Sequence, residues 1–413
     1  MNCRHCGSHL SLPFVNLGTA PPSNAYLEER DLGAPERYFP LRVLVCTDCW
    51  LVQTEDYARA DELFSPSYAY FSSFSTTWLN HAERYVADMV SAFQLTNQSC
   101  VVEVASNDGY LLQYVKARNI PCFGIEPTAS TAAAARAKGI DVVERFFDVE
   151  LATELIDQGK QADLLVANNV LAHVPDINGF CRAVSMLLQS SGVATFEFPH
   201  LMRLVAETQF DTIYHEHYSY LSLTAVDRIF EHNGLHIFNV EKLPTHGGSL
   251  RVFAQRSASS TRERNLSVTD LLKQEAANGV GTRAFYNDFQ SKADKIRDDF
   301  VSFLIEAKRA GKTVAGYGAA AKGNTLLNYA GIRPDQLTYV ADRSTVKQGK
   351  FLPGCRIPVV SESRIREERP DYIAILPWNL RDEIMEQLSY VSSWGGQFVT
   401  AVPCLKLHQR ETP

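Results

Sequence analysis

The chain has 413 residues, which corresponds to two or three domains at about 150 residues per domain. Hydrophobic residues make up 45% and charged residues 21% of it, which are proportions typical of folded domains. The formal net charge of −7 argues against binding to nucleic acid polymers or to anionic membrane surfaces. No apolar run is long enough to span a membrane, and the opening residues, MNCRHCGSHL, lack the apolar core of a secretion signal. We therefore expect a cytoplasmic protein.

Two Cys-x2-Cys pairs near the start of the chain are formed by Cys3, Cys6, Cys46 and Cys49. Paired thiolates at this spacing can surround a zinc ion tetrahedrally, and four protein ligands leave no open position for chemistry. We therefore predict a structural zinc site, although the gap between the pairs is longer than in a typical zinc ribbon. Metal-free thiols are the alternative. A redox role is disfavoured because neither pair opens a thioredoxin-like βαβ unit.

The segment between the two cysteine pairs includes residues 17–27, LGTAPPSNAYL, whose glycine and proline pair predict a loop held in place by the metal. His5 and His9 lie beside the first pair. Because four thiolates are available, we expect both imidazoles to face solvent.

Short apolar strands alternate with helices from about residue 99, which predicts a parallel α/β sheet. We expect strands at residues 100–105, 122–125 and 162–167, and a helix at residues 110–118. The first strand ends in a polar turn, Ser-Asn-Asp-Gly, and the second ends in Glu126.

The turn and the acid predict a nucleoside site, because an acid after the second strand can accept hydrogen bonds from ribose hydroxyls. There is no G-x-G-x-x-G, and an acidic strand with a polar turn suits a cationic ligand without phosphate, such as S-adenosylmethionine. An ordinary strand, turn and helix is the alternative. The predicted cofactor-binding residues are Glu103, Ser106, Asn107, Asp108, Gly109, Glu126, Asn168 and Asn169.

Residues 259–309 are polar and helical in character, and we expect them to link two globular units. A second α/β unit follows, with strands at residues 313–317 and 337–342 and a helix that ends near residue 329. The turn after its first strand is bounded by glycines and carries Lys322, which together predict an anion site. A Walker motif is absent, so nucleoside triphosphate hydrolysis is not expected.

Several motifs recur together along nearly the whole chain in the order of a known family. Besides the cysteine pairs, they are EVASNDGYLLQ (103–113), GIEP (124–127), ANNVLAHVPD (167–176), YHEHYSY (214–220), THGGSLR (245–251) and GYGAAAKGN (316–324). In this combination the chain resembles the sugar C-methyltransferases that act on nucleotide-linked ketosugars. The resemblance implies an α/β protein with a small zinc-binding domain (1–66), a class I, Rossmann-like methyltransferase domain (67–258), and a helical linker plus a Rossmann-like nucleotide-sugar domain (259–413).

The resemblance also implies a reaction, methylation of C-3′ in a dTDP- or other NDP-linked 4-keto-deoxyhexose by S-adenosylmethionine. A ketone at C-4 acidifies the hydrogen on C-3, so a base with a pKa near neutral can form an enolate that displaces the methyl group in line. By resemblance, His217 is the base, while Tyr214 and Glu216 orient the substrate or the base. A transition-metal site in the Tyr-His-Glu-His-Tyr run is an alternative, although the spacing of a metal-binding helix is missing.

Further residues are expected around the sugar. His173 follows the third strand, where the crevice of an α/β sheet opens. The resemblance makes Tyr68 and Tyr70 part of a lid and His246 a reserve catalytic or oxyanion residue. It also makes the last domain a holder of the nucleotide, with its diphosphate near the following residues: Lys322, Asn324, Arg343, Lys347 and Lys350. The cations among them could also form a merely solvated face.

Two other functions remain open at this point. One is an NAD-dependent nucleotide-sugar oxidoreductase or epimerase that uses the last α/β unit, and the other is a non-catalytic zinc-ribbon adaptor with a degenerate methyltransferase fold. We take a monomer without nucleic acid or membrane partners as the working assumption.

Overall fold

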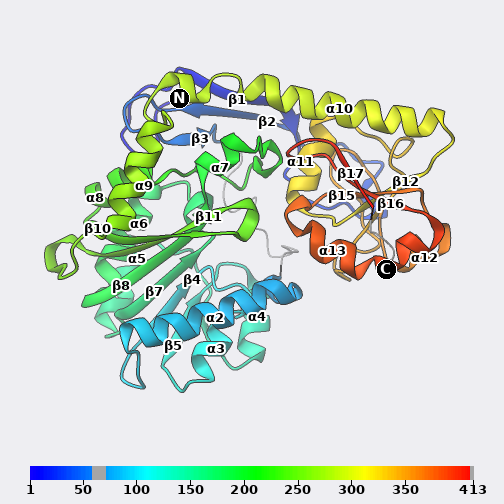
Figure 1. Cartoon of the computed structure of the whole chain (residues 1–413). Helices are drawn as coiled ribbons and strands as arrows, with labels where there is room; N and C mark the ends of the chain where they lie inside the picture. Colours follow the sequence, from blue (N-terminus) through cyan, green and yellow to red (C-terminus); the bar gives the residue numbers. More distant parts are fainter. Residues whose placement is uncertain (58–70, 410–413) are drawn as a thin grey trace.

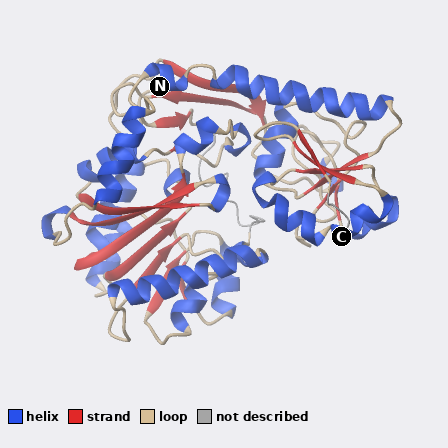
Figure 2. Cartoon of the chain, in the orientation of Figure 1, coloured by secondary structure: helices blue, strands red, loops and turns tan. Residues whose placement is uncertain are grey.

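The computed structural model describes residues 1–57 and 71–409. Two lobes lie side by side, and the N-terminal strands and the long helix α10 (Phe289–Arg309) run along one side of both (Figure 1). The described parts of the chain contain three sheets. Each lobe has helices around its own sheet (Figure 2). Within the described residues, no helix combines the length and the apolar character that a membrane crossing needs.

The N-terminal sheet is antiparallel, in the order β1-β2-β3-β9. Its strands are β1 (Leu12–Ala20), β2 (Phe39–Val45), β3 (Val52–Thr54) and β9 (Ser219–Tyr220). The predicted loop at residues 17–27 is wrong for its first part, because β1 continues to Ala20, which pairs with Phe39. β9 comes from far along the chain, so this sheet crosses the predicted domain boundary at residue 66. The two predicted domain boundaries stay a prediction.

The middle sheet has the order β10-β11-β8-β7-β4-β5-β6, with β10 and β11 antiparallel to their neighbours. Its strands are β4 (Val101–Val104), β5 (Cys122–Ile125), β6 (Asp141–Val143), β7 (Ala162–Asn168), β8 (Leu188–Pro199), β10 (Leu235–Leu243) and β11 (Ser249–Arg256). The helices of this part are α2 (Thr76–Phe93), α3 (Leu112–Lys116), α4 (Ala129–Ala137), α5 (Val149–Asp157), α6 (Ile177–Leu187), α7 (Leu201–Ala206), α8 (Leu223–His232) and α9 (Leu266–Ala277). The three predicted parallel strands are confirmed to within a residue at each end.

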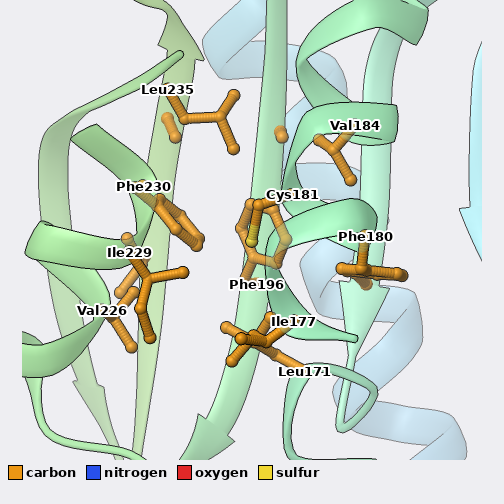
Figure 3. Close-up of a cluster of buried hydrophobic side chains, with 14 of the residues drawn as sticks. Leu171, Ile177, Phe180, Cys181, Val184, Phe196, Val226, Ile229, Phe230 and Leu235 are labelled. Atoms are coloured by element: carbon orange, nitrogen blue, oxygen red, sulfur yellow. The ribbon is translucent and has the colours of Figure 1, made fainter. Parts of the chain in front are cut away.

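Helical periodicity explains how α6 and α8 cover this sheet. In α6, Ile177, Phe180, Cys181 and Val184 recur at spacings of three and four residues and are buried together. They pack with Phe196 of β8 and with apolar residues of α8 in one cluster (Figure 3). This packing fixes β8 and β7, whose ends carry part of the site described below.

The C-terminal sheet has the order β14-β13-β12-β15-β16-β17, and only β17 is antiparallel to its neighbour. Its elements are β12 (Val314–Tyr317), α11 (Ala321–Tyr329), β13 (Val340–Ala341), β14 (Val359–Val360), α12 (Ser363–Glu368), β15 (Tyr372–Ile375), α13 (Arg381–Gln387), β16 (Gln397–Thr400) and β17 (Lys406–His408). The predicted strand at residues 337–342 is shorter in the structure, where it covers two residues. In both large sheets the first strand is central, the next two lie on one side, and the following two lie on the other side.

The predicted helical linker does more than connect two units. One face of α10, including Phe289, Ile296 and Phe300, is buried in a cluster that joins the N-terminal sheet to the C-terminal lobe. The ring of Phe14 in β1 stacks on Phe289 at 4.2 Å between centroids. The opposite edge of the N-terminal unit, with Leu51, belongs to the core of the middle sheet. The N-terminal unit is therefore shared between both lobes rather than independent of them.

Candidate active site

A cavity of about 1310 Å³ extends from the carboxyl ends of the middle strands to the C-terminal lobe. Such crevices are where α/β folds bind ligands. Three parts of the chain line it, and the lining residues that carry functional groups include Asn24, Trp78, His81, Asn107, Tyr110, Glu126, Asn168, Asn169, His173, Tyr214, His217, Thr245, His246, Lys322, Lys347 and Asn379. The cavity thus forms one continuous space between the middle and C-terminal units.

Glu126, directly after β5, provides a carboxylate at the cofactor end of this cavity. One of its oxygens accepts a hydrogen bond from the backbone N–H of Asn107 and the other accepts one from that of Thr128, both at 2.9 Å. Burial raises the pKa of Glu126, while these backbone bonds lower it. Each carboxylate oxygen has a second lone pair, so Glu126 can still accept hydrogen bonds from hydroxyl groups of a ligand.

The turn after β4 depends on backbone conformations that only a few residue types tolerate. Asn107 and Gly109 have φ values of 50° and 74°. A Cβ on Gly109 would lie 2.4 Å from Cδ1 of Ile140, so a larger residue does not fit. The turn thereby presents Asn107 to the cavity.

The remaining residues predicted around the cofactor divide into two groups. Asn107, Glu126, Asn168 and Asn169 line the cavity. Four others, in β4 and in the turn after it, do not line the cavity: Glu103, Ser106, Asp108 and Gly109. Within the described residues, Glu103 Oε2 and Asp108 Oδ1 have no hydrogen-bond partner, and burial raises the pKa of Glu103 well above its ordinary value.

His217 lies in a cluster of rings at the centre of the cavity. Its ring centroid is 4.0 Å from that of Tyr214 and 4.5 Å from that of His173. The Nδ1–H of His217 donates to the carbonyl oxygen of Thr212 at 2.8 Å, so Nε2 is the unprotonated nitrogen. Burial, and secondly the neighbouring His173, lower the pKa of His217 well below its ordinary value. A neutral imidazole with an unprotonated Nε2 is able to take a proton.

His173 and Glu216 are linked through the backbone. The Nδ1–H of His173 donates to the carbonyl oxygen of Glu216 at 2.8 Å, and burial lowers the pKa of His173 to about 4. The carboxylate of Glu216 is fully buried and does not line the cavity; its Oε1 accepts from Nδ2 of Asn24 at 3.2 Å. Burial raises the pKa of Glu216 to about 7. Glu216 is therefore placed to hold the backbone around the base, not to touch a ligand in the cavity.

His246 faces the cavity from a strained turn, with a φ of 53°. Its Nε2 accepts a hydrogen bond from Nδ2 of Asn169 at 3.3 Å, and its ring lies 5.1 Å from that of Trp78. Burial lowers the pKa of His246 to about 4. The imidazole is therefore neutral and its Nε2 is already engaged, which makes it a weaker base candidate than His217.

A buried network beneath this turn was not predicted from the sequence. Glu197 of β8 is fully buried and accepts from Oγ1 of Thr245 at 2.8 Å, from Nε2 of His81 at 2.9 Å and from Arg251 at 3.1 Å. These cationic and hydrogen-bonding partners hold the pKa of Glu197 below its ordinary value despite burial. The acid within the apolar run VATFEF was the signal that could have revealed it.

The C-terminal lobe contributes two cations to the cavity, Lys322 and Lys347. Lys322 Nζ donates to Oδ1 of Asn379 at 2.6 Å, and Lys347 Nζ donates to the carbonyl oxygen of Ala319 at 2.8 Å. The other predicted substrate residues lie elsewhere. Arg343 is exposed, Lys350 does not line the cavity, and Asn324 is buried with its amide donating to Ser23; Tyr68 and Tyr70 lie outside the described residues.

The four N-terminal cysteines are confirmed as a cluster, with all their sulfur atoms within 4.8 Å of one another. The Sγ atoms of Cys3 and Cys49 are 3.5 Å apart, and those of Cys6 and Cys46 are 3.4 Å apart. These separations suit four thiolates around one tetrahedral zinc ion with no open position. The hydrogen bond from Cys49 lowers the pKa of the Cys3 thiol to about 4, which favours the thiolate that a metal binds.

The two histidines beside the cysteines differ from each other. His9 is exposed as predicted. The prediction for His5 is wrong, because it is half-buried against the middle lobe, with its Nδ1 2.9 Å from Oδ1 of Asn178.

The class of protein follows from the middle sheet and its crevice. Residues 78–240 match the family model described as "Methyltransferase domain", and residues 3–64 match "Putative zinc binding domain". Together with the Rossmann-like sheet and the acid after its second strand, these matches define an S-adenosylmethionine-dependent methyltransferase with a zinc-binding domain.

The family is shown by the rest of the chain. Residues 244–403 match the model "C-methyltransferase C-terminal domain". C-methyltransferase NovU of Streptomyces niveus is 33% identical over 401 residues, which cover 97% of this chain and 95% of that protein. The chain therefore belongs to the C-methyltransferase family. This assignment excludes the oxidoreductase and the non-catalytic adaptor as descriptions of the protein.

Solved structures resemble only part of the chain. An S-adenosylmethionine-dependent methyltransferase from Clostridium acetobutylicum has 12% identity and a TM-score of 0.36, covering 43% of this chain and 92% of that one. Magnesium protoporphyrin IX methyltransferase from Synechocystis has 15% identity and a TM-score of 0.34, covering 43% of this chain and 79% of that one. Likenesses this low support no further conclusion.

Proposed function

We propose that this C-methyltransferase acts at C-3′ of a dTDP- or other NDP-linked 4-keto-deoxyhexose. The observation that carries the proposal is the placement of His217, whose neutral imidazole faces a cavity shared by an acidic cofactor crevice and a lobe with two lysines. A base, a cationic cofactor and an anionic substrate are the requirements of alkylation at a carbon beside a ketone.

His217 is proposed to remove the C-3 proton through Nε2. The hydrogen bond from Nδ1 to Thr212 fixes the tautomer, and the rings of Tyr214 and His173 limit how the imidazole can turn. The phenol hydroxyl of Tyr214 can donate a hydrogen bond to the substrate. Glu216 acts indirectly, through its backbone carbonyl on His173.

The cofactor end fits S-adenosylmethionine, which supplies an electrophilic methyl group on a sulfonium. Glu126 would accept from the ribose hydroxyls, while Asn107, Asn168 and Asn169 border the same crevice. The carboxylate of Glu126 is the acidic group at this end of the cavity, which favours a cationic ligand over a phosphate.

The C-terminal lobe is proposed to hold the nucleotide, with Lys347 near the diphosphate. We also propose that the enzyme works in the cytoplasm, which its free cysteines favour.

The direct test is incubation with labelled S-adenosylmethionine and a panel of nucleotide-linked 4-keto sugars. We expect transfer of label, with carbon NMR placing the new methyl group on C-3. The C-4 ketone also acidifies the hydrogen on C-5. A new methyl group on C-5 would therefore show that the enzyme acts at C-5 and not at C-3. No transfer to any 4-keto sugar would overturn the proposal.

A further inference from the structure

Lys322 is held in the cavity by an amide and an aromatic ring, near the buried carboxylate of Asp211. Its side chain extends from the first turn of α11, and Nζ donates to Oδ1 of Asn379 at 2.6 Å. The same ammonium lies 5.1 Å from the ring centroid of Trp378, a distance at which the aromatic face attracts a cation. The buried carboxylate of Asp211 also attracts this ammonium, although no salt bridge between described residues involves Lys322.

Trp378 brings this lysine next to the turn of the middle lobe that carries His246. Its indole N–H donates to Oδ2 of the buried Asp211 at 2.8 Å, which fixes the ring. A Cβ on Gly247 would lie 2.5 Å from Trp378, so the ring packs directly against the turn that carries His246. Lys322 is consequently close to the reacting end of the cavity.

The electrostatics agree with this position. The positive charge of Lys322 contributes to lowering the pKa of His217 and of His246, after burial. His173 is neutral as well. Burial lowers the pKa of Lys322, whereas the nearby Asp211 carboxylate raises it and favours the ammonium form. An anion that arises beside His217 would be stabilised by this positive charge.

Proton abstraction from a ketosugar creates such an anion. A neutral ketone and a neutral imidazole become an enolate and an imidazolium, and separating these charges in a buried cavity is costly unless a fixed dipole or charge meets the new oxyanion. Resting on the function proposed above, we propose that Lys322 is a catalytic residue whose Nζ–H donates to O-4 of the ketosugar and stabilises the enolate.

The step balances without any further reactant. Nε2 of His217 takes the C-3 proton, the C–H electron pair forms the C-3=C-4 double bond, and the carbonyl π pair moves to O-4. When C-3 then bonds to the methyl carbon, the C–S pair stays on sulfur, the carbonyl re-forms, and the proton on His217 leaves to solvent.

The competing role for Lys322 is a contact to the substrate diphosphate. Lys347 is better placed for that contact, because it donates to Ala319 in the glycine-bounded turn that leads into α11, where anions commonly bind. Lys322 instead lies over Trp378, which packs against the turn that carries His246.

The experiment measures enolate formation without methyl transfer. Wild type and Lys322→Met, each saturated with S-adenosylhomocysteine, are incubated with dTDP-4-keto-6-deoxyglucose in D₂O, and proton NMR follows loss of the C-3 signal. We expect Lys322→Met to slow exchange at saturating sugar by about 10²-fold, the effect of removing one oxyanion donor. Lys322→Arg keeps the charge and should stay within about tenfold of wild type. Lys312→Met, which removes an exposed lysine on the same lobe, is the matched control.

A second measurement separates the two roles. The dissociation constant of dTDP, measured by calorimetry, should change less than about threefold in Lys322→Met. Weaker dTDP binding with unchanged exchange at saturating sugar would overturn the inference in favour of a diphosphate contact. An equal loss of exchange in the Arg and Met variants would also overturn it. Absence of exchange in the wild type would instead overturn the proposed function, and this inference with it.

Discussion

The two α/β lobes follow the same chain path but use their crevices differently. In each, an acid after the second strand accepts from the first turn: Glu126 from Asn107 in the middle lobe, and Asp342 from Ala319 at 2.6 Å in the C-terminal lobe. In the middle lobe the turn opens onto the cavity. In the C-terminal lobe the carbonyl of Ala319 already accepts from Tyr26 and Lys347. Shared topology therefore does not imply a shared function, because the residues at the crevice decide it.

The difference extends to charge. In the middle lobe the buried Glu126 borders the cavity, whereas in the C-terminal lobe Lys322 and Lys347 line the same cavity. One lobe thus suits a cationic cofactor and the other an anionic substrate, with His217 between them.

The largest effect on activity is expected from a change of His217, which lies between the two crevices. His217→Ala should lower kcat by about 10³-fold, because the imidazole whose unprotonated Nε2 takes the proton is removed. The affinity for S-adenosylhomocysteine, measured by calorimetry, should not change. His236→Ala, which alters a half-buried histidine outside the cavity lining, serves as the control. Turnover near the wild-type value in His217→Ala would remove this residue from the base role.

The zinc site tests the part of the chain that joins both lobes. Cys46→Ser should lower the free energy of unfolding by on the order of 4 kcal/mol, since the metal loses a ligand and no longer links the two cysteine pairs of the N-terminal unit. Denaturant unfolding and zinc content measure the change. Cys404→Ser, at an exposed cysteine outside the cluster, should leave both unchanged. A stable, folded Cys46→Ser protein that is inactive would show that the metal has a role in chemistry.

The comparison of the two acids can be made directly. Glu126→Gln should weaken S-adenosylhomocysteine binding by about 30-fold, because a charged hydrogen-bond acceptor is lost. Asp342→Asn, the equivalent change in the other lobe, should alter this affinity by less than about twofold. If the Asp342 variant weakened cofactor binding as much as the Glu126 variant, the proposed division of labour would be wrong.

A smaller effect should appear in the pH dependence of stability. The pKa of His173 is about 4 in the folded protein, below its ordinary value, so as pH falls below about 6.5 the unfolded chain binds the proton first and stability is lost. Between pH 7.5 and 5.5 this one histidine should account for a loss of about 1 kcal/mol. Urea unfolding at both pH values should show a smaller loss in His173→Gln. An identical loss in wild type and variant would contradict the low pKa.

Local signals in the sequence predicted the helices and strands more reliably than they predicted how those elements pack. β5 was predicted without error because Pro121 and Pro127 bound a short apolar run. α10 was predicted as a helix, but an apolar helical face does not reveal its partner, so its place against β1 could not be foreseen. The strand β13 was predicted too long, because the apolar residues Leu337 and Tyr339 are buried without being part of the strand.

The same limit applies to the site. Residues that form a motif along the chain, such as Tyr214 and His217, were found together in the cavity. Trp78 and Asn379 were missed because they come from distant segments and belong to no motif. Arg343 and Lys350 were predicted to contact the substrate but do not line the cavity. A group of charged residues in the sequence does not distinguish a cavity wall from a solvated surface.

The shared N-terminal sheet also constrains how the chain folds. β3 needs β9 as its neighbour, and β1 needs α10, so the first strands synthesised find partners that emerge only after most of the chain exists. Contacts this distant in sequence form slowly, because closing long loops precedes any stabilising contact. The N-terminal segment therefore has no complete core until late in synthesis. We expect a fragment that ends before β9 to expose the apolar faces of β1 and β2 and to aggregate, even with zinc present.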